Sequence, residues 1–365
     1  MRRLPIYFLV DVSESMVGEP IQQVEDGMRT IIQELRTDPY ALETAYVSVI
    51  AFAGKAKTLS ALTELYKFYP PRFPIGGGTS LGVAMNHLMD HINVDVVKTT
   101  AETKGDWKPI VFLFTDGTPT DNPQSAFERW NNKFRGHASI VCISIGDNAD
   151  TELLSQISDN VFRLKDANKE AFNAFFKWVT ASIKTTSQSV AEFNVDEVQL
   201  APADGINLEK IDNTLFTKLD ENFAVLPAKC QTTKKSYLIK FAKRGIIAQQ
   251  IEEIRHLPDV ERRFKLVGAY PIDEEQYLAL GDGHPTHRNI NTNDLIGQPA
   301  CPCCGNQLGM VVCECGNVFC VGEDGHSKCP WCGMEGELGT IDSGGIDVTR
   351  GRSEEHTSEL QSHYS

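Results

Sequence analysis

Eight of the ten cysteines in this 365-residue chain lie in one short segment, CPCCGNQLGMVVCECGNVFCVGEDGHSKCPWC, between Cys301 and Cys332. Cys301 with Cys304, and Cys329 with Cys332, form two C-x-x-C pairs, each followed by a glycine. Glycine permits the tight turn after the second cysteine, so two thiolates can face one ion. Such crowding predicts metal ligation in a reducing compartment, and hence a cytoplasmic protein, rather than a disulfide framework.

Tetrahedral zinc takes four such ligands, and the segment offers enough for two ions, which we expect rather than one. The predicted ligands are Cys301, Cys304, Cys313, Cys315, Cys320, His326, Cys329 and Cys332. Cys303 is then left over, and few apolar residues lie between the ligands, so folding should need the metal. Two pairings remain open: a cross-brace, in which the first, second, fifth and sixth ligands share an ion, and a ribbon, in which the two C-x-x-C pairs share one.

Upstream, residues 1–187 alternate between apolar strands and amphipathic helices. LPIYFLVDV, TAYVSVIAFAG, KPIVFLFTDG and SIVCISIGD are continuous apolar runs, as expected of strands buried on both faces. PIQQVEDGMRTIIQELR and SLGVAMNHLMDHI have helical periodicity, and KEAFNAFFKWVTASIKTTS is expected to be the closing helix. This order predicts an α/β fold with a doubly wound, mostly parallel sheet.

Three polar clusters follow buried strands or precede a helix in this region. Asp11, Ser13 and Ser15 come after the first strand, Thr79 follows three glycines, and Asp116 ends another strand. Ligands of such sheets bind at the carboxyl ends of the strands. Carboxylate and hydroxyl oxygens suit Mg²⁺, Mn²⁺ or Ca²⁺. Asp and Ser are also frequent in turns and helix caps, which is the simplest explanation of the first cluster taken alone.

The pattern Asp11-x-Ser13-x-Ser15, then Thr79, then Asp116, resembles the metal-ion-dependent adhesion site of von Willebrand factor A (VWA) domains. The resemblance covers residues 1–187. It implies that the two aspartates reach the cation through water, and that an acidic residue of a partner protein fills an open position on it. Glu14 and Asp121 are expected to be solvated or to support the ligands rather than bind the ion. His87 and His91 are four residues apart on one helix face, and we expect an ordinary surface helix there rather than a metal site.

The rest of the chain is expected to form a small β-rich region at 188–297, the zinc-binding module at 298–340 and a tail at 341–365. Residues 352–365 resemble a translated sequencing adapter and are excluded from the functional interpretation. His284 and His287 lie in a polar loop and are not expected to bind metal. The net charge of −14 argues against a protein that binds nucleic acid through phosphate contacts. No apolar run approaches the ~20 residues that span a membrane.

A VWA domain followed by a cysteine-rich module resembles the bacterial TerY proteins of tellurium-resistance systems. That resemblance implies a non-catalytic adaptor, not an enzyme, in stress or phage-defence signalling. The implied partners are a protein kinase and a metal-dependent protein phosphatase. Two alternatives are a RING-like ubiquitin ligase and a structural subunit of a nucleic-acid-processing complex. A hydrolase that uses the first cation is a further, less favoured alternative, because no general base or nucleophile stands out near that site.

Overall fold

The computed structural model describes residues 2–100, 102, 104–145, 151–164, 169–188, 200–201, 208–210, 223–243, 263–281, 289–322, 326–337 and 346–349. The chain divides into two compact units. The first unit comprises Met1–Asn222 and Asp273–Asp282, and the second comprises Phe223–Ile272 and Gly283–Ser365. The predicted tail artefact, His284 and His287 lie outside the described residues.

The first unit is built on a seven-stranded sheet of order β3-β2-β1-β4-β5-β6-β7. The strands are β1 (Leu4–Asp11), β2 (Ala45–Phe52), β3 (Ala56–Glu64), β4 (Ile110–Thr115), β5 (Ser139–Ile145), β6 (Asn160–Leu164) and β7 (Leu208–Lys210). The five central strands pair in parallel, whereas β3 and β7 are antiparallel edge strands. The predicted doubly wound, mostly parallel α/β fold is therefore confirmed.

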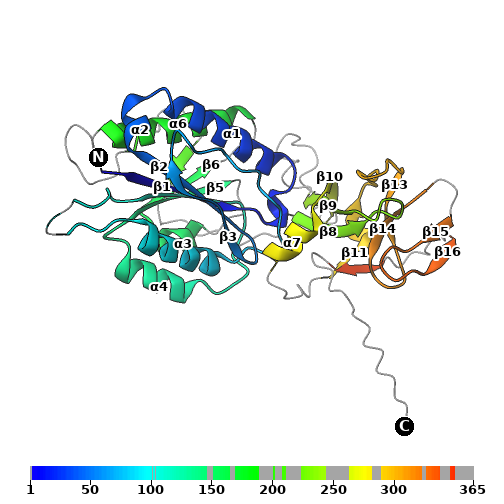
Figure 1. Cartoon of the computed structure of the whole chain (residues 1–365). Coiled ribbons are helices and arrows are strands. Elements are labelled where there is room, and N and C mark those ends of the chain that lie inside the picture. Colours follow the sequence, from blue (N-terminus) through cyan, green and yellow to red (C-terminus); the bar gives the residue numbers. More distant parts are fainter. Residues whose placement is uncertain are drawn as a thin grey trace, which may run out of the picture. The chain divides into compact units, whose positions relative to one another are not determined.

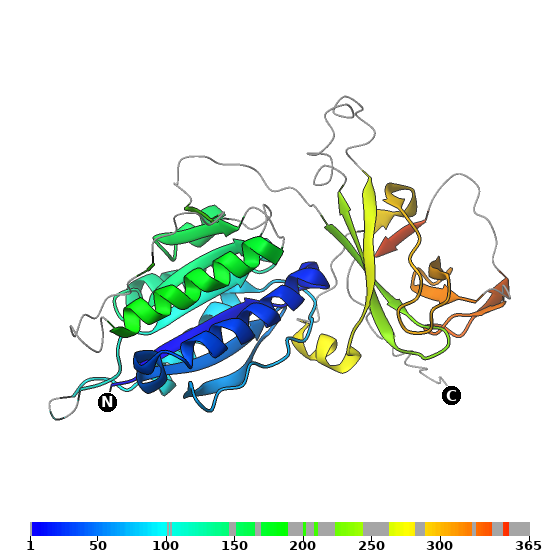
Figure 2. The same cartoon turned by 90° about the horizontal axis from the view of Figure 1, so that it is seen from above.

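Helices cover both faces of this sheet (Figure 1). The helices are α1 (Glu19–Leu35), α2 (Pro39–Thr44), α3 (Leu81–Asp95), α4 (Gln124–Lys133), α5 (Thr151–Ser155) and α6 (Lys169–Gln188). α1, α2 and α6 lie on one face and α3 and α4 on the other, and Figure 2 shows α1 and α6 side by side. Alternate residues of β1 enter the two cores, with Phe8 facing α1 and α6 and Leu9 facing α3 and α4. Within the described ranges, no helix has the length and apolar character needed to cross a membrane.

Close packing between α1 and α6 depends on a glycine. A Cβ added at Gly27 would overlap the ring of Phe176, which is itself buried in the core. We therefore expect Gly27→Ala to lower the free energy of unfolding by about 2 kcal/mol, because overpacking outweighs the roughly 1 kcal/mol that alanine gains in a helix. Urea denaturation measures the change. Gly136→Ala is the control, since an added Cβ there meets no atom within 4 Å; equal stability of the two variants would contradict the expectation.

The second unit contains a six-stranded sheet of order β12-β10-β9-β8-β14-β13. Its strands are β8 (Phe223–Lys229), β9 (Ser236–Lys243), β10 (Phe264–Pro271), β12 (Leu295–Ile296), β13 (Leu308–Val312) and β14 (Val318–Val321). Two small sheets pair β11 (Asn289–Asn291) with β17 (Asp347–Thr349) and β15 (His326–Lys328) with β16 (Glu335–Glu337). Because β8 pairs with β14, the boundary predicted at residue 298 does not separate two folding units.

One helix of the predicted β-rich region packs with the first unit instead. α7 (Glu274–Leu280) places Leu280 in the core beneath α1 and α6. The backbone N–H of Lys55 donates to the carbonyl of Leu280, at 2.7 Å. A Cβ added at Gly76 would lie 2.6 Å from the Leu280 Cβ, so this glycine allows the close approach. The sequence gives α7 no distinguishing signal, because its assignment to the first unit depends on these long-range contacts.

Candidate metal centres

The first candidate centre begins where β1 ends. Asp11 is fully buried, and its two carboxylate oxygens have different partners. Oδ1 accepts a hydrogen bond from the backbone N–H of Ser13 at 2.9 Å, and Oδ2 accepts one from the Thr115 hydroxyl at 2.6 Å. The hydroxyl oxygens of Ser13 and Ser15 lie 3.0 Å apart. Asp11 therefore organises the loop that carries both serines.

The other two predicted ligands reach the same place from separate loops. β1 and β4 are parallel neighbours in register, so their carboxyl ends lie side by side. The Ser15 hydroxyl donates to Asp116 Oδ1 at 2.7 Å. A Cβ added at Gly117 would lie 3.6 Å from Thr79 Oγ1 and 3.8 Å from Ser15 Oγ, so these two hydroxyl oxygens lie close to the same point. The structure thus brings together all five side chains that the sequence singled out.

The loop that presents Thr79 is held by backbone contacts. Gly78 has a φ of +84°, which favours glycine at this turn. The N–H of Thr79 donates to the Thr120 hydroxyl at 2.9 Å, and the N–H of Thr120 returns a bond to the Thr79 carbonyl at 2.8 Å. Asp121 accepts from two N–H groups in the first turn of α3, those of Gly82 and Val83. Asp121 therefore fixes the helix behind Thr79.

Electrostatics at this centre favour a cation. Burial and, to a smaller extent, the neighbouring Asp116 carboxylate together raise the pKa of Asp11 to about 7. A divalent cation would neutralise both carboxylates, while the three hydroxyls would complete its oxygen shell. The donor set therefore fits Mg²⁺, Mn²⁺ or Ca²⁺. That these residues hold such an ion stays a prediction.

The remaining polar residues near the first centre have other partners. The Tyr277 hydroxyl of α7 donates to the Glu14 carboxylate. The Nε2 atoms of His87 and His91 lie 2.8 and 2.9 Å from the Thr58 hydroxyl oxygen. These histidines therefore interact with strand β3.

Cysteines form two further candidate centres. In each of two groups the four sulfur atoms lie within 4.8 Å of one another. The first group is Cys230, Cys301, Cys304 and Cys320, and the second is Cys313, Cys315, Cys329 and Cys332. Cys303 belongs to neither group, as expected from the sequence, and Cys142 is buried in β5.

The sulfur separations match tetrahedral zinc. Sγ–Sγ distances are 3.7 Å for Cys304–Cys320, 3.8 Å for Cys230–Cys320, and 3.6 Å for Cys313–Cys332. A Zn–S bond of about 2.3 Å gives a tetrahedron with an edge of about 3.8 Å. A disulfide needs about 2.05 Å, so these cysteines are free thiols set for a shared ion. The two groups are consistent with two zinc sites.

The grouping follows the cross-brace order rather than the ribbon. Cys301 and Cys304 share a group with Cys320, whereas the C-x-x-C pair at Cys329 and Cys332 belongs to the other group. His326 was predicted to be one of the eight ligands, and in the cross-brace pairing it would complete the first group. The structure places this residue on β15 and places Cys230 in the position of the fourth ligand.

Sequence reasoning missed Cys230, although its turn repeats the pattern of the recognised ones. The N–H groups of Gly305 and Gly333 donate to the carbonyls of Cys301 and Cys329, four residues earlier, and Lys234 donates to Cys230 in the same way. Lys234 also adopts the left-handed conformation, with a φ of +59°, that the two glycines adopt. The signal was hidden because Lys234 replaces the glycine and Thr233 replaces the second cysteine.

Hydrogen bonds prepare Cys230 for metal binding. Its Sγ accepts from the backbone N–H of Thr233 at 3.3 Å, and the N–H of Gln231 donates to Cys320 Sγ at the same distance. Burial acts to raise the pKa of Cys230, but the hydrogen bonds from Thr233, Cys304 and Thr232 together outweigh it and lower the pKa to about 6. Such N–H donors orient and stabilise thiolate ligands.

Comparisons with known proteins divide the chain in the same way. Residues 6–177 match the model of the von Willebrand factor type A domain, and residues 220–353 match that of the TerY-C metal binding domain. The second match begins before Cys230 and so includes both cysteine groups.

Curated relatives match about half of the chain. Inter-alpha-trypsin inhibitor heavy chain H4 of Sus scrofa is 23% identical over 222 residues, which are 53% of this chain and 23% of that protein. Heavy chain H2 of Mus musculus is 26% identical over 165 residues, 42% of this chain and 17% of that protein. The chain therefore spans less than a quarter of the length of these relatives.

Two solved structures are also similar. The von Willebrand factor type A protein from Catenulispora acidiphila is 17% identical, with a TM-score of 0.39, and the match covers 50% of this chain and 43% of that one. Proximal thread matrix protein 1 from the mussel byssus, with a zinc-occupied MIDAS motif, is 19% identical, with a TM-score of 0.37, covering 51% and 46% of the two chains.

Proposed function

Because this chain joins a von Willebrand factor type A domain to a C-terminal TerY-C metal-binding domain, we propose that it is a non-catalytic adaptor. Its VWA domain binds a protein partner through a divalent cation at the adhesion site, and its zinc-binding domain docks a second surface. The observation that carries the proposal is the convergence of two carboxylates and three hydroxyls at the carboxyl edge of the sheet.

The chemistry of that edge supports capture rather than catalysis. Hydroxyl ligands solvate a cation without neutralising it, so the ion keeps its attraction for a further carboxylate. An aspartate or glutamate of the partner is the expected ligand at the open position. Among the described residues, side chains of the types that act as a base or nucleophile have other positions. The two histidines of α3 interact with Thr58, and Cys142 lies within β5.

The second domain extends the proposal to a signalling system. We assign one Zn²⁺ to each cysteine group and Mg²⁺, Mn²⁺ or Ca²⁺ to the adhesion site. The resemblance to TerY proteins implies that the bound partners include a protein kinase and a metal-dependent protein phosphatase, in a stress or phage-defence response. Eight thiolates that ligate metal require a reducing compartment, which supports a cytoplasmic location.

A second candidate function follows from the ligand order. Cross-brace fingers occur in RING ubiquitin ligases, and the two cysteine groups interleave as a cross-brace does. The arrangement differs from a RING in that Cys230, from the turn between β8 and β9, supplies one ligand. Ubiquitin transfer with a conjugating enzyme, lost in Cys301→Ser, would favour this alternative.

Affinity capture tests the adaptor function. We expect wild-type chain to retain a partner from the lysate of its source in Mg²⁺ and to release it in EDTA, and Thr79→Ala to retain at most about a tenth as much, because a ligand of the bridging cation is gone. Ser80→Ala is the control, since Ser80 is an equally buried neighbour whose hydroxyl makes no capping hydrogen bond.

Equal capture by wild type and Thr79→Ala, or capture that EDTA leaves unchanged, would show that the cation does not mediate binding.

A further inference from the structure

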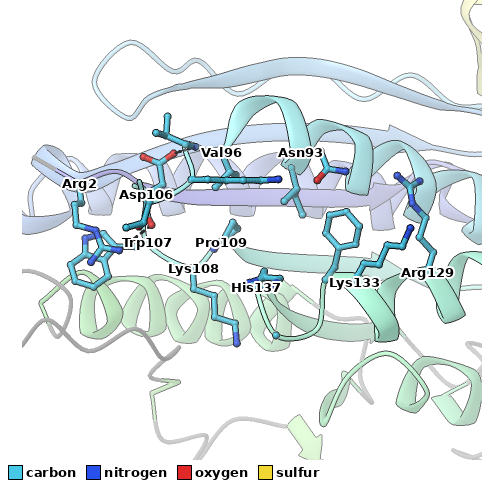
Figure 3. Close-up of a pocket in the computed structure, with 16 residues that line it drawn as sticks. Arg2, Asn93, Val96, Asp106, Trp107, Lys108, Pro109, Arg129, Lys133 and His137 are labelled. Carbon is cyan, nitrogen blue, oxygen red and sulfur yellow. Dashed lines mark hydrogen bonds between the residues drawn. The ribbon is translucent and has the colours of Figure 1, made fainter. Parts of the chain in front are cut away.

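A cavity of about 780 Å³ lies at the edge of the sheet opposite the adhesion site. It opens where β4 and β5 begin and where α3 and α4 end, and Arg2 borders it from the start of the chain. Figure 3 shows Arg2 beside Trp107 at one end and Lys133 with Arg129 at the other. The volume is within the range of about 300–1,000 Å³ typical of small-molecule sites.

The lining of this cavity is strongly cationic, although the whole chain carries a net charge of −14. Its cations are Arg2, Lys98, Lys108, Arg129 and Lys133, with His137 among them. Arg129 forms an ion pair with Asp90 outside the lining, at 2.5 Å. The Arg2 guanidinium donates to the carbonyls of Gly105 and Asp106, which carry no net charge to neutralise it.

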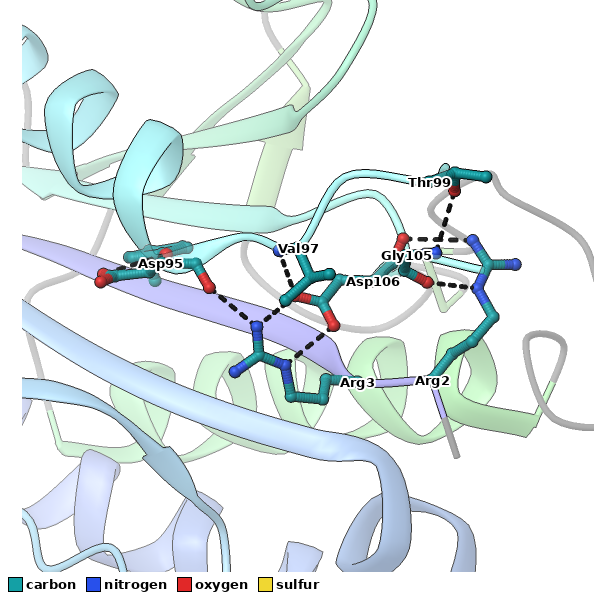
Figure 4. A network of polar contacts seen from close by, with 8 residues as sticks. Arg2, Arg3, Asp95, Val97, Thr99, Gly105 and Asp106 are labelled. Carbon is teal, nitrogen blue, oxygen red and sulfur yellow. Dashed lines mark hydrogen bonds and ion pairs between the residues drawn. The ribbon is translucent and has the colours of Figure 1, made fainter. Parts of the chain in front are cut away.

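Among the described residues that line the cavity, Asp106 is the only one with a carboxylate, and its charge is already compensated. Arg3 donates to both its oxygens, at 2.8 and 2.5 Å, and the N–H of Val97 donates to Oδ2 at 2.8 Å (Figure 4). A bidentate hydrogen bond from a guanidinium is among the strongest interactions of a carboxylate with another side chain. Asp106 therefore does not oppose an anion in the cavity.

The same contacts fix one wall of the cavity in place. Arg3 also donates to the carbonyl of Asp95 at 2.8 Å, which ties the end of α3 to the start of β1. The N–H of Gly105 donates to the Thr99 hydroxyl at 3.0 Å. A wall fixed before the ligand arrives costs little ordering entropy on binding.

Two further features decide what the cavity favours. The carboxy-terminal ends of α3 and α4 face it, and each contributes a partial charge of only about −0.5, so together they cancel about one of the cations. The apolar wall of the cavity comes from Trp107 and Phe134, which are each 5% exposed, and from Pro109.

We propose that this cavity binds a small organic phosphate of nucleotide size. The phosphate groups lie among Arg2 and the lysines, and the organic part lies against the apolar wall. Phosphate fits better than a single carboxylate because several cations face one space, and an anion of charge −2 or more neutralises more of their charge. The site is separate from the adhesion site and from both cysteine groups.

Isothermal titration with ATP, AMP and inorganic phosphate tests the proposal. The full chain is used in EDTA and with Asp11→Asn, so that metal-bridged binding at the adhesion site cannot contribute. The pocket variant is Lys98→Glu with Lys133→Glu, both exposed lysines. The matched control is Lys57→Glu with Lys177→Glu, which makes the same charge change on exposed lysines outside this lining. Circular dichroism checks that each variant is folded.

We expect ATP or AMP to bind at least about tenfold more tightly than inorganic phosphate, and the pocket variant to lose at least about tenfold in affinity, since each lysine removed is a charged donor. The control variant is expected to change affinity by less than about threefold, because salt screens the long-range effect of the two distant charges. No nucleotide binding at millimolar concentration, equal loss in both variants, or inorganic phosphate binding as tightly as AMP would each overturn the proposal.

Discussion

Replacing Cys230 by serine is expected to reduce the zinc content of the purified chain from two ions to one. Serine leaves three thiolates in the first cysteine group, which no longer complete a tetrahedron. Structural zinc contributes an apparent ~10–16 kcal/mol, whereas a whole domain is stable by only ~5–15 kcal/mol. We therefore expect the TerY-C domain of the variant to melt well below that of the wild type.

Replacing Cys230 is expected to affect the structure of the domain as well as the ligand set. Cys230 lies in the turn between β8 and β9, and Cys320 lies on β14, so an ion in this group cross-links the centre of the six-stranded sheet. The apolar core beneath it contains three of the group's own cysteines, Cys230, Cys301 and Cys320. Losing the ion removes the order of the core together with the cross-link.

Two controls separate ligation from the mere loss of a sulfur or an imidazole. Cys303→Ser removes a cysteine of the same segment that belongs to neither group, and we expect it to retain two zinc ions. His326→Ala tests the ligand that the sequence predicted in place of Cys230, and it is also expected to retain two. Zinc is measured by atomic emission and unfolding by circular dichroism. Two ions in Cys230→Ser and one in His326→Ala would reverse the assignment.

Asp11→Asn is expected to weaken Mn²⁺ binding by the VWA domain by about 100-fold or more while the domain stays folded. The change removes one of two carboxylates and with it half of the negative charge that attracts the ion. The asparagine oxygen can still accept from the N–H of Ser13, the bond that organises the loop. Mn²⁺ titration followed by electron paramagnetic resonance measures the free ion. Glu14→Gln is the control, because Glu14 lies in the same loop and is not a predicted ligand.

The wild type is expected to show a pH dependence that this variant lacks when no divalent cation is present. Asp11 has a folded-state pKa of about 7, above its ordinary value of 3.8, so ionising it is unfavourable in the fold. Between these values the folded state binds more protons than the unfolded state, and stability falls as pH rises through 7. In EDTA we expect the wild type to lose stability relative to Asp11→Asn from pH 5 to pH 8, and Mn²⁺ to reverse this. Parallel melting temperatures across that range would contradict the assignment.

The local sequence was sufficient to predict the fold of the VWA domain and its candidate ligands. Continuous apolar strands and periodic helices define its sheet, and the ligand candidates stand at strand ends, where parallel topology brings them together. The role of Asp121 at the start of α3 was not predictable in the same way, since its partners lie 38 and 39 residues away.

In the TerY-C domain, local sequence predicts most of the grouped cysteines but not all of them. Seven of its eight grouped cysteines lie in a segment whose spacing predicts metal ligation. Cys230 lies 71 residues before Cys301, and Lys234 and Thr233 replace the residues that mark the other turns. Only the pairing of β8 with β14 brings it to Cys320.

The sequence by itself determined the α/β class of the first domain, the five candidate oxygen ligands and the presence of a thiolate metal module. These depend on residue type, periodicity and short spacing, which are properties of neighbouring residues. The tertiary structure decided the partition of the cysteines, the place of α7 and the cationic cavity. These depend on strand pairing and side-chain packing between segments far apart in the chain, and the free energy of such contacts is not contained in any one segment.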